Sequence, residues 1–257
     1  MEIPTLRGQM PPTYQQEPHP VIPFDYGCRA CPYGKDKAGP VGGVGPSDLS
    51  KVRLLVISDY PGHYEVQEGY PFVPKPPVYQ SNRSKKIRMS WANAGAALRY
   101  ALGQLGLNSY DDCWLTNTLK CSPAADSGKV KETELDTCTR LWLYQEVWQL
   151  HLVNPKLPIW LAGSQALAGF RRTFKPFPKG SVNDFRRKVT WWLEHPVVVT
   201  WNPSAYCRSE FRATLSHSHP DKVKPVFDQL VPLTPWEVYH RDWALLKQFL
   251  QDYDSTP

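Results

Sequence analysis

The chain has 257 residues, enough for one large domain or two small ones with a sizeable buried core. Apolar residues make up 41% of the chain and charged residues 21%, which excludes a disordered protein, and no apolar run is long enough to span a membrane. The net charge of +6 is mild, so it permits nucleic-acid binding without demanding it.

The chain begins with a proline-rich segment. Residues 1–27 contain six prolines and no hydrophobic periodicity, so we expect an extended arm ahead of a folded domain at 28–257. The first residues also lack the charged-then-apolar pattern of a secretory signal, and we therefore expect a cytoplasmic protein.

Four short, strongly apolar runs predict strands that are buried on both faces of a sheet. Longer runs with apolar residues at helical spacing lie between and after them. This alternation predicts an α/β fold, a three-layer sandwich around a central, mostly parallel four-stranded sheet. The predicted strands are 52–59, 113–117, 158–163 and 196–201, and the predicted helices are 91–105, 131–152, one that Ser164 caps, and 236–251.

Polar side chains stand just beyond three of these strands, at Asp59, Asn117 and Asn202. Because parallel strands end at one edge of a sheet, where α/β proteins bind ligands, we expect these side chains to face one crevice. Asn and Asp are also common in the turns that end strands, so a purely structural role is the alternative. Ser164 faces the same edge, either as a plain N-cap or as part of a phosphate site at the helix N-terminus.

Six cysteines in a cytoplasmic chain argue against a disulfide framework. Cys28 and Cys31 form a Cys-x-x-Cys pair, which is open to three interpretations: a redox pair, half of a zinc site, or part of an iron–sulfur site. The surrounding proline- and glycine-rich sequence weakens the redox interpretation, which needs a helix N-terminus after a strand. We expect Cys113 and Cys207 to be core or loop thiols.

The order of the motifs resembles the iron–sulfur uracil-DNA glycosylases, family 4 of the uracil-DNA glycosylase superfamily. Residues 58–62 (S-D-Y-P-G) are similar to the family's Gly-Glu-x-Pro-Gly motif, and residues 69–73 (G-Y-P-F-V) to its Gly-Arg-Pro-Phe-Val motif. Phe72 keeps the family's spacing of 13 residues from the acid. Residues 116–121 (T-N-T-L-K-C) look like the Thr-Asn-x-x-Lys-Cys segment. The resemblance covers about residues 25–252, apart from an inserted stretch around 75–90.

This resemblance implies a [4Fe–4S] cluster with Cys28, Cys31, Cys121 and Cys138 as ligands. Four thiolates from two distant segments suit such a cluster, which would join the N-terminal region to the long helix in a structural role. A Cys₄ zinc site is the alternative.

The resemblance also implies hydrolysis of the N-glycosidic bond of a pyrimidine flipped out of DNA. Phe72 would stack on the base, Asn117 would pair with its polar edge, and Asp59 would orient water or stabilise positive charge on the sugar. Main-chain N–H groups around Tyr60 and Gly62 would add donors.

Basic residues supply the expected DNA contacts. Arg208, six residues after Asn202, resembles an arginine that follows the family's last motif. Two basic clusters could follow DNA phosphates, although a solvated charged face is the alternative. They comprise residues 83–88 and Arg171, Arg172, Lys175, Lys179, Arg186, Arg187 and Lys188. We expect DNA as the partner, a monomer, and no membrane contact.

Three residues of the implied base pocket depart from the family pattern. Asp59 is one methylene shorter than the usual Glu, about 1.5 Å of reach. Tyr60 replaces a small or amide residue, and Asn202 replaces the usual His, although Asn-Pro-Ser is the form of the mismatch-specific thymine/uracil glycosylases. The resemblance therefore implies a base-excision repair glycosylase for uracil or another pyrimidine, including modified ones such as occur in phage DNA. The alternative is an inactive glycosylase-fold module that binds DNA or a partner.

Overall fold

The computed structural model describes residue 31 and residues 40–74, 78–80, 88–90, 93–123, 130–207, 223–226, 229–232 and 235–254. The expected arm at 1–27, Cys28, Arg208 and the basic residues 83–87 lie outside these ranges. The arm and the domain boundary at residue 28 therefore stay predictions.

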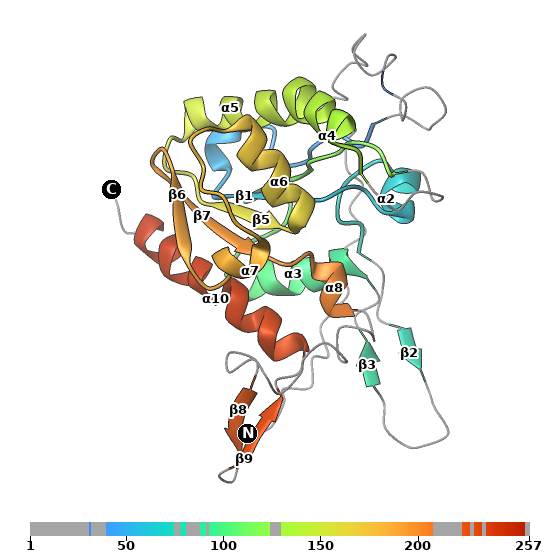
Figure 1. Cartoon of the computed structure of the whole chain (residues 1–257), viewed down its shortest axis with the longest axis vertical. Coiled ribbons are helices and arrows are strands. Elements are labelled where there is room, and N and C mark those ends of the chain that lie inside the picture. The colour runs from blue at the N-terminus through green and yellow to red at the C-terminus, as the bar shows by residue number, and fades with distance from the viewer. Residues whose placement is uncertain are drawn as a thin grey trace.

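A five-stranded sheet forms the centre of the fold (Figure 1). Four of its strands are parallel neighbours, and the fifth, β6, pairs antiparallel with β7 at one edge. Every residue of β1, β5 and β7 is buried, as expected for strands covered on both faces. The strand order is β4 (Cys113–Asn117), β1 (Leu54–Ser58), β5 (Ile159–Ala162), β7 (His195–Thr200) and β6 (Val189–Trp192).

The structure confirms the α/β class and corrects the predicted number of strands from four to five. In β6 only Trp192 is buried, and the other three residues are exposed or partly exposed. An edge strand of this kind has no continuous apolar run, and its extended form depends on pairing with β7 across the turn at Leu193 and Glu194. Two short hairpins lie outside the sheet: β2 (Val78–Gln80) with β3 (Arg88–Ser90), and β8 (Val223–Val226) with β9 (Gln229–Pro232).

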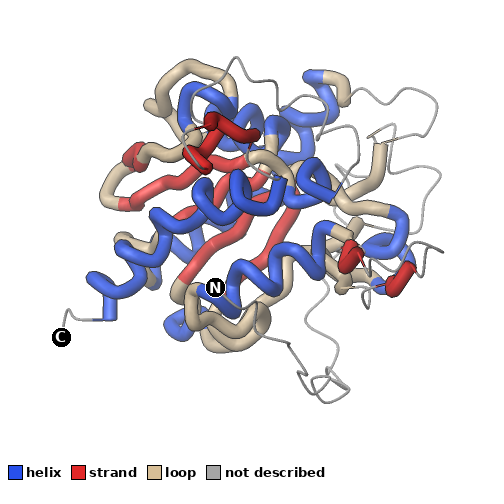
Figure 2. Tube along the Cα trace, turned by 90° about the horizontal axis from the view of Figure 1, so that it is seen from below, coloured by secondary structure: helices blue, strands red, loops and turns tan. Residues whose placement is uncertain are grey.

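Helices cover both faces of the sheet (Figures 1 and 2). One face carries α3 (Ala94–Gln104), α8 (Pro203–Cys207) and α10 (Pro235–Asp254). The other carries α4 (Glu132–Cys138), a π-helical segment (Thr139–Leu143), α5 (Tyr144–Val153) and α6 (Ser164–Thr173). The shorter helices are η1 (Leu49–Lys51), α2 (His63–Glu68) and α7 (Val182–Phe185).

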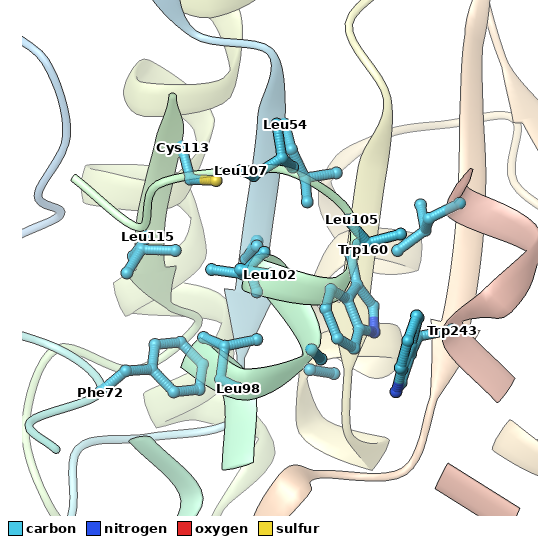
Figure 3. Close-up of a cluster of buried hydrophobic side chains, with 14 of the residues drawn as sticks. Leu54, Phe72, Leu98, Leu102, Leu105, Leu107, Cys113, Leu115, Trp160 and Trp243 are labelled. Carbon is cyan, nitrogen blue, oxygen red and sulfur yellow. The ribbon is translucent and has the colours of Figure 1, made fainter. Parts of the chain in front are cut away.

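Strand β1 supplies both hydrophobic cores, because successive side chains of a strand point to opposite faces. Leu54 and Val56 pack with α3 and α10, whereas Leu55 and Ile57 pack with α5 and α6. Cys113 is fully buried in the first core (Figure 3), and burial raises the pKa of its thiol well above the usual value. Cys113 is therefore a core thiol, as expected. Within the described ranges, no helix is both long and apolar enough to cross a bilayer.

Candidate functional site

A cleft of about 630 Å³ opens at the carboxyl ends of the parallel strands. It is the place where the topology of an α/β sheet puts a ligand. The structure brings together six of the residues singled out from the sequence. They are Asp59, Tyr60, Gly62, Phe72, Ser164 and Asn202.

The carboxylate of Asp59 sits at the N-terminus of α6. Its Oδ1 accepts hydrogen bonds from the backbone N–H groups of Gln165 at 2.8 Å and Ala166 at 3.0 Å. Its Oδ2 accepts a hydrogen bond from the side-chain amide of Asn202 at 3.2 Å. The free N–H groups and partial positive charge of a helix N-terminus favour a carboxylate at this position. The acid is thus held in one orientation from two sides.

A glycine makes this contact possible. Gly163 links β5 to α6 with a φ of +134°, and a Cβ on it would lie 2.2 Å from Oδ1 of Asp59. Because atoms cannot approach so closely, any side chain at position 163 would displace the carboxylate. The sequence places Gly163 at the end of a strand but does not show that the carboxylate of Asp59 packs against it.

Ser164 is not the N-cap of α6, so that expected role is wrong, whereas its role in phosphate binding stays a prediction. The N-cap of α6 is Gly163, and the group that accepts from the first N–H donors is the carboxylate of Asp59. Since Asp59 already occupies this N-terminus, a phosphate would meet a negative charge there. Ser164 lines the cleft with an exposed side chain.

Asn202 supports Asp59 with its side-chain amide. Its Nδ2 donates to Ser58 Oγ at 2.9 Å and to Asp59 Oδ2 at 3.2 Å. Its Oδ1 accepts from the backbone N–H of Ser204 at 2.9 Å, which fixes which end of the amide faces Asp59. A side-chain amide has two N–H groups, and here both are used within the protein. This arrangement makes Asn202 a support for Asp59 rather than a free donor to a base.

Glu65 is a site residue that sequence reasoning missed. It lines the cleft, and its two carboxylate oxygens accept hydrogen bonds from the backbone N–H groups of Gly62 and Phe72. The N–H of Gly62 is therefore engaged, contrary to the expected role of a free donor. Burial raises the pKa of Glu65, against the effect of the two backbone hydrogen bonds. The sequence did contain a signal for this role, because Glu65 is an acidic residue in the first turn of the helix that begins after Gly62.

Phe72 combines a core role with a place in the cleft. Its side chain is 2% exposed and packs near Leu98 (Figure 3), yet it also lines the cleft. Its φ is +56°, a conformation that costs a bulky residue about 1–3 kcal/mol and is held by surrounding structure. Glu65 supplies part of that support, and Gly95 allows the backbone of Phe72 to pack closely on α3. Tyr60 differs in being 36% exposed at the cleft.

Asn117 ends β4 beside Ser58 but is not among the residues that line the cleft. Its side chain is buried, and its Nδ2 has no hydrogen-bond partner among the described residues. Leaving a buried amide donor unpaired costs about 1–3 kcal/mol, so this group needs a partner beyond the described residues.

Three of the four cysteines expected as ligands gather in one place. Cys31, Cys121 and Cys138 line a single small apolar cavity. The backbone N–H of Lys120 donates to Cys138 Sγ at 3.1 Å. No group of three or more Cys, His, Asp or Glu in the described part of the chain has the geometry of a metal site. The donor chemistry nevertheless fits a thiolate-ligated group, and the position of Cys28 lies outside the described residues.

A buried ion pair stands behind this cavity. Lys120 Nζ lies 2.8 Å from Glu146 Oε2, and both side chains are almost fully buried. Thr116 Oγ1 donates to the same carboxylate at 2.6 Å. The pair ties the segment after β4 to α5, the helix that continues from Cys138.

Two of the basic residues expected to contact DNA form ion pairs within the protein, and Arg171 donates to the carbonyl of Gly180 at 2.8 Å. Arg172 pairs with Asp136 and Glu132, each at 2.9 Å, and these hydrogen bonds raise its pKa. Arg186 is buried in an ion pair with Asp242. Lys175, Lys179, Arg187 and Lys188 are exposed.

The fold and the site thus define an α/β sandwich with an acid-bearing cleft at the carboxyl ends of its parallel strands, an arrangement that many ligand-binding proteins and enzymes share. A sequence model of the uracil DNA glycosylase superfamily matches residues 45–230. The chain belongs to this superfamily, whose enzymes are in general DNA glycosylases that hydrolyse N-glycosidic bonds. No curated protein matches the chain significantly.

Proposed function

We propose that the protein is a DNA glycosylase of the iron–sulfur kind, which removes uracil or another pyrimidine, including a modified one, from DNA. The observation that carries this proposal is the fixed carboxylate of Asp59 in a cleft that Phe72 also lines. Hydrolysis breaks the bond between the sugar carbon and the base nitrogen, and the bonding electrons leave with the base. Water then supplies the hydroxyl group on the sugar and a proton to the base.

In this proposal the carboxylate of Asp59 stabilises the positive charge that develops on the sugar and orients the attacking water. Because three N–H donors already hold it, little reorganisation is needed in the transition state. Phe72 stacks on the flipped base, a contact worth about 1–3 kcal/mol. Asn117 would donate its Nδ2–H to a base carbonyl once binding of the base makes this buried side chain accessible from the cleft.

The test incubates the purified full-length protein with oligonucleotides that carry uracil or 5-substituted pyrimidines and measures abasic sites by alkaline cleavage. Asp59→Asn should reduce cleavage by at least a hundredfold and preserve DNA binding, because the charge serves the transition state more than the ground state. Asp48→Asn is the matched control, since Asp48 caps η1 outside the cleft. Full activity of Asp59→Asn would remove this residue from the mechanism.

A second candidate function has one observation in its favour. Both N–H groups of the Asn202 amide are used on Ser58 and Asp59, which leaves none to donate to a leaving base. An inactive module that binds DNA or a protein partner would have this property. The same experiment separates the two functions: intact DNA binding with no base released from any oligonucleotide supports the second.

We further propose that Cys28, Cys31, Cys121 and Cys138 bind a [4Fe–4S] cluster. The support is the apolar cavity that three of these thiols share, together with the N–H donor of Lys120 at Cys138. When bound, the cluster would join the segment around Cys31 to α4 and leave the cleft chemistry to other residues.

Anaerobically purified protein should contain about four irons and four sulfides per chain, as a Cys₄ cluster requires. Cys121→Ser should reduce the iron content, whereas Cys113→Ser should leave it unchanged because Cys113 is buried in the other core. Stoichiometric zinc without iron would establish the zinc alternative instead.

A further inference from the structure

A buried ionic cluster lies behind one wall of the cleft and is not used by the proposed chemistry. Arg186 binds Asp242 through two hydrogen bonds: Nε donates to Oδ2 and Nη2 donates to Oδ1, each at 2.8 Å. The hydroxyl group of Tyr206 donates to Oδ2 of the same carboxylate at 2.6 Å. Arg186 and Asp242 are almost fully excluded from water, with side-chain exposures of 6% and 0%.

This cluster connects three separate segments. Asp242 lies in α10, beyond the residues that the superfamily model matches. Arg186 directly follows α7, whose Val182 and Asn183 line the cleft, and Tyr206 lies in α8, whose Ser204 and Ala205 line it too. A single carboxylate of the C-terminal helix therefore holds one wall of the cleft together.

The cluster also fixes an aromatic ring that faces the cleft. The guanidinium carbon of Arg186 stands 5.0 Å from the ring centre of Trp201, within the range of a cation–π contact. The ring of Tyr206 packs against the same indole, with a centroid distance of 6.5 Å. Trp201 lines the cleft and directly precedes Asn202, the residue that supports Asp59.

We propose that Trp201 is a specificity-determining residue, and that Arg186, Tyr206 and Asp242 are positioning residues that hold its ring. This inference rests on the proposed function and deepens it. An indole that contacts both a guanidinium and a phenol is restrained from moving aside for a larger base. A rigid wall discriminates among pyrimidines by the size of their ring substituents, and one methyl group in a tight pocket changes selectivity about 10–200-fold.

The test measures binding, so that it does not depend on turnover. Oligonucleotides carry 2′-fluoro-2′-deoxyuridine or its 5-methyl analogue, because a 2′-fluorine disfavours the positively charged sugar and blocks cleavage. The measured quantity is the ratio of the dissociation constants for the 5-methyl and the unmethylated base. Trp201→Ala should lower this ratio by about tenfold or more, since the larger base gains space.

The positioning role has its own readout. Tyr206→Phe removes one hydroxyl group and keeps the ring, so it should fold and still lower the ratio several-fold. Combined with Trp201→Ala it should add nothing, because it acts through the indole. Lys247→Ala, on an exposed position of α10, is the control and should leave the ratio unchanged. A merely structural role would change stability without changing the ratio.

The outcomes separate this inference from the proposed function. An unchanged ratio in Trp201→Ala, with abasic sites still formed on the natural base, overturns the specificity role alone. A shifted ratio in a protein that releases no base overturns the proposed catalysis alone. Additive effects of Tyr206→Phe and Trp201→Ala overturn the positioning role of the buried cluster.

Discussion

Replacing Gly163 by alanine tests the central contact of the cleft. The new Cβ would lie 2.2 Å from Oδ1 and 2.4 Å from Oδ2 of Asp59, so the carboxylate has to leave the N-terminus of α6. The φ of +134° adds backbone strain of about 1–3 kcal/mol for a residue with a side chain. Asp59 also loses its hydrogen bonds to Gln165 and Ala166, each worth about 1.5–3 kcal/mol for a charged acceptor.

Water at the cleft will replace part of the lost hydrogen bonding, so we expect Gly163→Ala to reduce the free energy of unfolding by about 3 kcal/mol. For a chain of this length, that loss lowers the melting temperature by about 6–12 °C. Base excision should fall at least tenfold at temperatures where the variant is fully folded, because the acid is misplaced.

The measurements are urea unfolding followed by circular dichroism and abasic-site formation under single-turnover conditions. Gly103→Ala is the matched control, because Gly103 lies in α3 with nothing near its Cβ position. That change should raise stability by about 0.5–1 kcal/mol and leave excision unchanged. A Gly163→Ala variant with the stability and activity of the native protein would refute the proposed position of Asp59.

Three further predictions concern other parts of the structure. Lys120→Met should lower the free energy of unfolding in urea by about 3–5 kcal/mol, because it leaves the carboxylate of Glu146 buried without its cation. Adding Glu146→Met should recover most of that loss. Equal stability of the single and double variants would contradict this prediction. Burial lowers the pKa of His195, so the unfolded chain binds a proton at a higher pH than the folded one. Stability should therefore decrease as the pH falls below about 6.5, and His195→Asn should flatten that dependence in unfolding measured from pH 8 to pH 5. Asn202→Ala should reduce base excision about 10–100-fold without weakening DNA binding, since it removes a hydrogen bond to the charged Asp59. Equal losses in the excision assay and in the DNA-binding assay would indicate a binding role instead.

Local patterns were sufficient to predict four of the five strands of the sheet. The runs around β1, β4, β5 and β7 are predominantly apolar because the residues of these strands are almost all buried, and this property is visible in a few consecutive residues. The half-exposed edge strand β6 escaped detection, because its conformation depends on a neighbour rather than on its own composition.

The sequence also determined that Asp59 and Asn202 share one edge of the sheet, because parallel strands end together. Their partners were decided by the tertiary structure. Asp59 meets the N–H of Gln165, 106 residues away, and Asn202 meets Ser58, 144 residues away. Contacts of such separation leave no periodic signal in the chain, since they arise only when β5 pairs with both β1 and β7 and α6 packs against β1. Position in the fold therefore follows from local hydrophobic pattern, whereas the orientation of each site side chain follows from packing between distant segments.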